Sequence, residues 1–224
     1  MLPRAVKSAL NQPGVDVEII LIDDASTDGG ETRALIQHYN DSFDNVKAVY
    51  RKQNGRIAAA LNSGIEAATG RYIIRLDSDD WFERGALAKM KATLDAHEAI
   101  GFVYGARKYY GRRSDVYKPA PFTREAFDFH NASGYAYMFR RVFIDKGLRF
   151  EALGTFNGAV IDLEDWQFAL KLLGVGAVGL SMPDTLVLHY TFRWGGTWQE
   201  LVTNKDAALD ILKQKFPSVK AVEL

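Results

Sequence analysis

The stretch Val-Glu-Ile-Ile-Leu-Ile-Asp-Asp-Ala-Ser-Thr-Asp (residues 17–28) decides the fold class. Its first six residues are nearly all apolar, as in a parallel strand that is covered on both faces. The apolar run stops at a cluster of turn and helix-capping residues that begins with Asp23 and Asp24. In open α/β sheets, ligands bind beyond the carboxyl ends of the strands. The stretch therefore predicts an α/β sheet with a candidate ligand site at this strand end.

A second apolar stretch that is followed directly by acidic residues lies further along the chain. Tyr-Ile-Ile-Arg-Leu (residues 72–76) predicts a strand that runs directly into Asp77, Asp79 and Asp80. Apolar residues recur at helical spacing between and around the two strands. The expected helices cover residues 2–10, 32–39, 57–68 and 87–94, and further strands cover residues 46–50 and 101–104. This alternation predicts an open, mostly parallel mixed sheet flanked by helices.

The second half of the chain is less regular. We expect a hairpin or loop at residues 107–121, and no linker or repeat divides the chain. The expected strands are residues 135–139 and 186–189, and the expected helices are residues 141–146, 164–173 and 198–212. We therefore expect a single domain over residues 1–224.

Composition excludes several classes of protein. The 224 residues are 47% apolar and 25% charged, which is typical of a globular chain rather than a disordered or collagen-like one. The chain has 28 Lys and Arg residues and 28 Asp and Glu residues, so its formal net charge is zero. The overall charge therefore does not favour nucleic acid as a partner. The absence of Cys excludes disulfides and thiolate catalysis. No apolar run approaches the roughly 20 residues of a membrane span, so we expect a cytoplasmic chain.

The acidic cluster at Asp77, Asp79 and Asp80 has two interpretations. Crowded carboxylates repel one another unless a cation or hydrogen-bond donors compensate them. Oxygen ligands with no His or Cys beside them suit Mg²⁺ or Mn²⁺, with substrate phosphates completing the shell. The alternative is that these residues cap helices or lie in solvated turns. Two acidic clusters at the ends of two strands favour the ligand site.

Three segments together resemble family 2 glycosyltransferases. Residues 22–28 resemble the first nucleotide-binding segment of that family, and residues 54–80 resemble its next block. Glu164 and Asp165, which precede an amphipathic helix, resemble the acidic pair that supplies the catalytic base. The match as a whole covers roughly residues 2–173. The three segments come in the family's order and contexts, which makes the resemblance specific.

The resemblance implies a GT-A fold and an inverting transferase. The donor would be a nucleoside diphosphate sugar, usually of uridine, and the cofactor would be Mn²⁺ or Mg²⁺. The acceptor would be a glycan or a lipid-linked glycan in the synthesis of surface polysaccharide or glycoconjugate. On this basis, residues 1–104 would form the nucleotide-binding half and residues 105–224 the acceptor-binding half.

The resemblance also implies roles for individual residues. Asp165 would be the catalytic base, with Glu164 as an accessory acid. The donor nucleotide would contact Asp24 and Asp79, and the metal would be held by Asp80, Asp77 and Asp79. Arg56 lies in the loop before a predicted helix, whose N-terminus could face phosphate, so it is a further candidate contact for the base or the diphosphate. Arg56 is equally well interpreted as a solvated loop cation. His189 is an accessory candidate near the diphosphate, although a single His is more often a core or edge imidazole.

Two features open alternatives. The basic and aromatic segment from Arg107 to Arg113 is either a solvated hairpin or a contact with an anionic acceptor or the inner face of a membrane.

The family normally opens with a buried strand, whereas residues 1–3 lead straight into a helix, so we expect a sheet that lacks its usual first strand. Such a chain could be a truncated, non-catalytic relative that binds nucleotide or glycan. A sugar-phosphate nucleotidyltransferase is a weaker alternative, because no Gly-rich, Arg-containing loop lies near the start.

Overall fold

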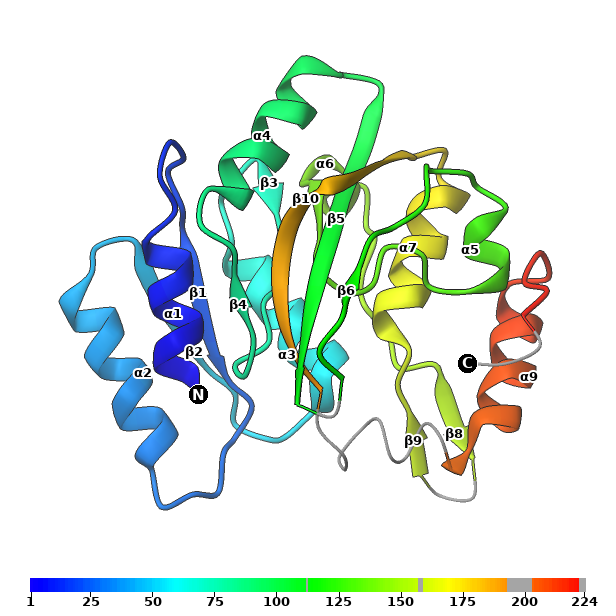
Figure 1. Ribbon diagram of the computed structural model, residues 1–224. Coiled ribbons are helices and arrows are strands. Elements are labelled where there is room, and N and C mark those ends of the chain that lie inside the picture. Colours follow the sequence, from blue (N-terminus) through cyan, green and yellow to red (C-terminus); the bar gives the residue numbers. More distant parts are fainter. Residues whose placement is uncertain (112, 157–158, 193–202, 222–224) are drawn as a thin grey trace.

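Helices and strands alternate through the first half of the chain, in a computed structural model that describes residues 1–111, 113–156, 159–192 and 203–221 (Figure 1). The helices are α1 (Leu2–Leu10), α2 (Glu31–Ser42), α3 (Arg56–Ala67), α4 (Ala86–Ala96), α5 (Ala126–Phe129), α6 (Val142–Asp145), α7 (Glu164–Gly174) and α9 (Lys205–Lys215). The strands are β1 (Ile19–Asp23), β2 (Val46–Tyr50), β3 (Tyr72–Ile73), β4 (Trp81–Phe82), β5 (Ile100–Gly111), β6 (Val116–Tyr117), β7 (Tyr137–Arg140), β8 (Gly154–Phe156), β9 (Ala159–Ile161) and β10 (Val178–Phe192).

The described strands form one large sheet and two small ones. The large sheet has the order β3-β7-β5-β10-β4, with β6 paired to β5. The pairs β1/β2 and β5/β10 are parallel, and the latter joins the two longest strands. The short strands β3, β4, β6 and β7 pair antiparallel. The prediction of a mixed sheet with flanking helices is confirmed. The parallel pairing among the described strands is between β1 and β2 and between β5 and β10.

Several local predictions differ from the structure. The strand expected at residues 72–76 is limited to β3, because the chain beyond Ile73 leaves the ladder with β7. Of the two alternatives for residues 107–121, the hairpin is the one observed, since β5 continues to Gly111 and pairs with β6. The hairpin of β8 and β9 was not predicted. Trp198, where the last helix was expected to begin, lies outside the described residues, and α9 begins at Lys205.

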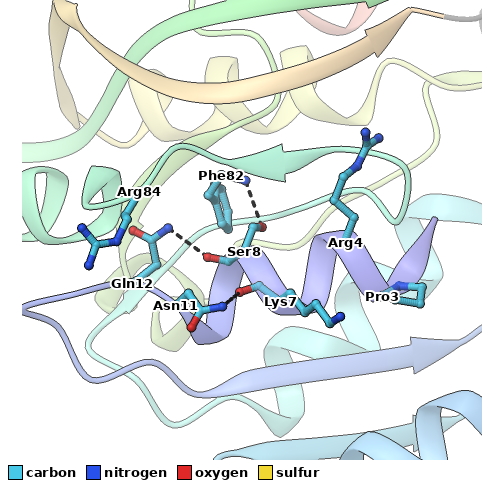
Figure 2. Close-up of a pocket in the computed structure, with 8 residues that line it drawn as sticks. All are labelled: Pro3, Arg4, Lys7, Ser8, Asn11, Gln12, Phe82 and Arg84. Carbon is cyan, nitrogen blue, oxygen red and sulfur yellow. Dashed lines mark hydrogen bonds between the residues drawn. The ribbon is translucent and has the colours of Figure 1, made fainter.

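Side chains of α1 join the sheet of β1 and β2 to the large sheet. The Ser8 hydroxyl accepts a hydrogen bond from the Phe82 amide at 3.0 Å, beside a shallow depression between α1 and β4 (Figure 2). The Gln12 amide group donates to the Glu83 carbonyl at 3.0 Å and accepts from the Leu87 amide at 3.3 Å. Gln12 is only 6% exposed, so these bonds are made away from water.

An opening separates β1 from the chain that follows β3. Its cavity volume is about 310 Å³, and Ile20, Ile22, Ile74 and Leu76 are among its lining residues. Within the described residues, β1 pairs only with β2, and β3 pairs only with β7. No described strand joins these two edges.

Strand β5 divides two hydrophobic clusters. Phe102 and Tyr104 pack into the cluster that contains α7, whereas Val103 packs into the cluster with α1 and α4. The proposed boundary between halves at residue 104 therefore falls inside a strand that serves both clusters. Trp166 and Phe168 are buried in the first cluster, which fixes α7 with its first turn near the end of β3.

Candidate active site

Arg75 lies at the centre of a charged network that joins the two acidic segments. Its Nε and Nη2 atoms bind the two Asp77 carboxylate oxygens at 2.7 and 2.9 Å. Its Nη1 atom binds the Glu164 carboxylate at 2.5 Å. Burial lowers the pKa of Arg75, but the charges of Asp77 and Glu164 outweigh this and raise it well above its usual value. The fold thus brings residues 77–80 beside the start of α7.

Asp80 is turned into the protein. It is 1% exposed, accepts a hydrogen bond from the Tyr135 hydroxyl, and accepts another from the Thr191 amide at 2.6 Å. Desolvation raises the pKa of Asp80 to about 6, although both hydrogen bonds oppose the shift. Because both carboxylate oxygens have protein donors, this arrangement favours a structural role for Asp80 over the predicted metal ligation.

The predicted metal cluster does not converge in the part of the chain that the structure describes, where no three His, Cys, Asp or Glu side chains could hold one ion. Asp77 faces Arg75, while the main-chain carbonyl of Asp79 accepts from Arg4 at 2.8 Å and from the Thr191 hydroxyl at 2.7 Å. Mg²⁺ is commonly bound by one or two carboxylates together with substrate phosphates. Both Asp77 oxygens bind Arg75, just as both Asp80 oxygens have protein donors, but the Asp77 side chain is 33% exposed whereas Asp80 is buried. Exposure therefore favours Asp79 and Asp77 over Asp80 as candidate metal ligands.

The first turn of α7 presents two different carboxylates. Glu164 is 6% exposed, and desolvation raises its pKa to about 7, with Arg75 opposing the shift and Asp165 adding to it. Asp165 is half-buried, and its oxygens accept from the Trp166 amide at 2.7 Å and the Asn131 amide group at 2.8 Å. Burial also raises the pKa of Asp165. Asp165 is the more accessible of the two, as a base that receives a proton from an incoming hydroxyl must be.

Asp24 anchors the end of β1 to the start of α3. Its Oδ1 atom accepts from the Arg51 Nε atom at 2.6 Å and from the Gly55 amide at 3.1 Å. Asp23 instead caps its own turn by accepting from the Ser26 amide at 2.9 Å. The structure therefore places Asp24 at a loop junction on the carboxyl edge of β1, as a nucleotide contact requires.

Arg56 does not lie free in solvent. Its Nε atom binds the buried Asp162 carboxylate at 3.1 Å, and its φ of +63° is uncommon for a residue other than glycine. This ion pair connects the start of α3 to the chain just before α7. Arg56 thus reaches toward the segment that carries Asp165.

His189 and the basic segment are held by neighbouring side chains. The His189 Nε2 atom lies 2.8 Å from a Glu83 carboxylate oxygen and its Nδ1 atom lies 3.0 Å from the Tyr110 hydroxyl, which favours a structural imidazole. Arg113 pairs with Asp115 at 2.5 Å, and the Arg107 guanidinium lies 4.2 Å from the Tyr117 ring centroid. No helix in the described ranges is both long and apolar enough to cross a membrane.

Sequence reasoning missed several residues of this network. Arg75 carried a usable signal, because a cation inside an otherwise apolar strand needs a partner. Asn131, Tyr135 and Thr191 carried none, since each reaches its acidic partner across a long separation in sequence.

Residues 1–155 match the profile of "Glycosyl transferase family 2". The chain belongs to this family. With this assignment, the family and enzyme class predicted from the sequence are confirmed.

Relatives of this family 2 chain include the "Putative teichuronic acid biosynthesis glycosyltransferase TuaG" of Bacillus subtilis, 40% identical over 84 residues, which are 38% of this chain and 32% of that protein. The "PGL/p-HBAD biosynthesis glycosyltransferase" of Mycobacterium bovis is 26% identical over 211 residues, covering 90% of this chain and 75% of that protein. The chain spans about a third of the length of the first of these relatives.

Solved structures show that the family 2 chain has the GT-A fold. S. aureus TarS residues 1–349 in complex with UDP-GlcNAc superpose with a TM-score of 0.75 at 17% identity, covering 95% of this chain and 61% of that one. The mannosyltransferase PcManGT from Pyrobaculum calidifontis, in complex with GDP-Man and Mn²⁺, gives a TM-score of 0.68 at 17% identity, covering 96% and 60%.

Proposed function

We propose that this chain binds a nucleoside diphosphate sugar, with uridine as the first base to test, and transfers the sugar with inversion to a glycan or lipid-linked acceptor. The product would enter surface polysaccharide or glycoconjugate synthesis, as the names of the relatives suggest for those proteins. The observation that carries the proposal is the position of Asp165, a half-buried carboxylate on the first turn of α7, within the charged network that includes Asp77.

The residues divide into a donor side and an acceptor side. Asp24, at the edge of β1, would contact the base, and Arg56 would face the diphosphate. A divalent ion held by Asp79 and Asp77 would stabilise the negative charge that develops on the departing diphosphate. The names of two structural neighbours, one bound to UDP-GlcNAc and the other to GDP-Man and Mn²⁺, support this donor class.

Asp165 would act on the opposite side of the sugar. Inversion needs one base that removes the proton of the acceptor hydroxyl as that oxygen attacks the anomeric carbon. Asn131 binds one Asp165 oxygen and the Trp166 amide binds the other, so the carboxylate is oriented before an acceptor arrives. Its raised pKa makes it a stronger base than an exposed Asp once it is ionised.

Paired variants test the proposal. Asp165→Asn keeps the size of the side chain, so UDP binding measured by calorimetry with Mn²⁺ should persist while transfer falls by about 10²–10⁴. Glu164→Gln should cost much less, because adjacent helix positions point about 100° apart. Near-wild-type transfer by Asp165→Asn would refute the assignment of the base. UDP binding without any transfer by the wild type would favour the non-catalytic relative instead.

A further inference from the structure

Arg75 contacts carboxylates from two segments, since it binds the nearby Asp77 and also Glu164, which is 89 residues away from Arg75 in sequence. The side chain is only 10% exposed, and its three contacting nitrogens bind Asp77 in a two-pronged pair and Glu164 through the remaining amino group. Arg75 is thus paired to acids on both sides of the candidate site. Its guanidinium is a direct link between the donor side and the base side.

A second contact extends this link to Asp80. The Arg75 guanidinium carbon lies 4.7 Å from the centroid of the Tyr135 ring, and the Tyr135 hydroxyl donates to the Asp80 carboxylate. Tyr135 is buried at 9% exposure, so the ring is held in place beneath the cation. The position of Arg75 thus affects Asp77 directly, Asp80 through Tyr135, and the α7 turn through Glu164.

We infer that Arg75 is a positioning residue that sets the separation between the donor-binding segment, residues 77–80, and the turn of α7 that carries Asp165. The inference rests on the proposed function. The planar guanidinium holds its donors in a rigid fork, so both carboxylates are fixed in direction as well as distance. Lysine would retain the charge but not the fork.

Replacing the Arg75 guanidinium with a lysine amine should lower the reaction rate more than it lowers the stability of the fold. Misplacement of reacting groups by about 1 Å can cost about 10²-fold in rate. We therefore expect Arg75→Lys to lower kcat by about 10²-fold while the acceptor KM changes little, because the acceptor's own contacts remain. Arg75→Met also leaves the buried Glu164 carboxylate and the partly exposed Asp77 carboxylate without a cation, and we expect it to be much less stable.

Arg140 provides a matched control. It is also partly buried, but it donates to main-chain carbonyls, at 2.7 Å to Ile100 and 2.6 Å to Leu94. Arg140→Lys should lower the melting temperature with no selective loss of kcat. The inference is overturned if Arg75→Lys has the kcat of the wild type, or if Arg140→Lys loses kcat to the same extent.

A second measurement needs no enzymatic activity. If Arg75 couples the two segments, the shifts in melting temperature from Asp77→Asn and Glu164→Gln should not add in the wild-type background. In the Arg75→Lys background, the same two shifts should become closer to additive. Additive shifts in the wild type would overturn the inference even if the chain transfers no sugar. Coupling in a chain that binds no UDP would instead refute the proposed function and leave the positioning of the two segments in place.

Discussion

Asp79 and Asp80 are adjacent in sequence, yet we expect them to have different roles. Asp80 uses both carboxylate oxygens within the protein, whereas a metal bound with a diphosphate needs only one or two carboxylates. Asp79 is half-buried at the same strand end. We therefore separate the two residues, although the sequence pattern treats them as one cluster.

This separation can be measured with two alanine variants. Asp79→Ala should weaken Mn²⁺-stimulated UDP binding by about tenfold or more, equivalent to about 1.4 kcal/mol, with little change in stability. Asp80→Ala should lower the free energy of unfolding by about 1–3 kcal/mol, because the Thr191 amide loses its acceptor. Calorimetry and denaturant unfolding check the two effects, and the reverse ranking would restore Asp80 as the metal ligand.

Glu164 should make stability depend on pH. Its pKa is raised from 4.5 to about 7 in the folded chain, so between these values the folded state binds more protons than the unfolded state. The free energy of unfolding contributed by this group is therefore highest below pH 4.5 and decreases as the pH rises toward 7. Glu164→Gln should flatten the slope in urea titrations across this window. An unchanged slope would show that the Arg75 ion pair keeps Glu164 ionised throughout.

At the scale of elements, periodicity was informative where one face of an element is buried. The helices at residues 2–10 and 164–173 and the strand at residues 46–50 are predicted within a residue or two of their observed bounds. Strand β3 is shorter than its apolar pattern, because its ladder with β7 ends at Ile73, and Arg75 beyond this end binds acids. The pairing of β8 with β9 is local in sequence, and the Asn-Gly dipeptide at residues 157–158 was a usable hairpin signal that apolar periodicity alone misses.

The candidate site was predictable only in part, because its acidic residues are partnered by residues from distant segments of the chain. Carboxylates at strand and helix ends can be found from sequence, which is how Asp24, Asp79 and Asp165 were selected. Their partners could not, because Asn131 and Thr191 have no local feature that distinguishes them from other polar residues. Pairing also changed the interpretation of Asp80 and His189, whose polar atoms are occupied by the protein.

Helix α1 offers a test of how the two sheets are joined. Gln12→Ala removes the partner of the Glu83 carbonyl and of the Leu87 amide, so we expect it to lower the free energy of unfolding by about 1–3 kcal/mol. Asn11→Ala is the control, since Asn11 is exposed and bonds only within α1, to the Lys7 carbonyl (Figure 2). Its effect should stay within about 0.5 kcal/mol. Equal losses would show that α1 does not join the sheets through Gln12.

At the scale of the whole molecule, the opening beside β1 should be detectable as faster hydrogen exchange of the β1 backbone amides that face it. Alternate residues of a parallel strand direct their amides to opposite sides. The Ile19 amide is bonded on the β2 side, to the Asn45 carbonyl, so the amides of Ile20 and Ile22 face the opening. These two amides should exchange faster than that of Leu21 when followed by NMR. Equal protection would show that another group covers this edge.

The opening has a consequence for how the chain keeps its shape when a donor binds. Asp24 follows β1 of the small sheet, whereas Asp79 follows β3 of the large sheet, and no ladder among the described strands joins the two sheets. A nucleotide that contacts both residues would add a connection between these two sheets. Binding energy of this kind adds to folding energy by mass action. The donor would then determine the lifetime of the chain against proteolysis as well as its reaction.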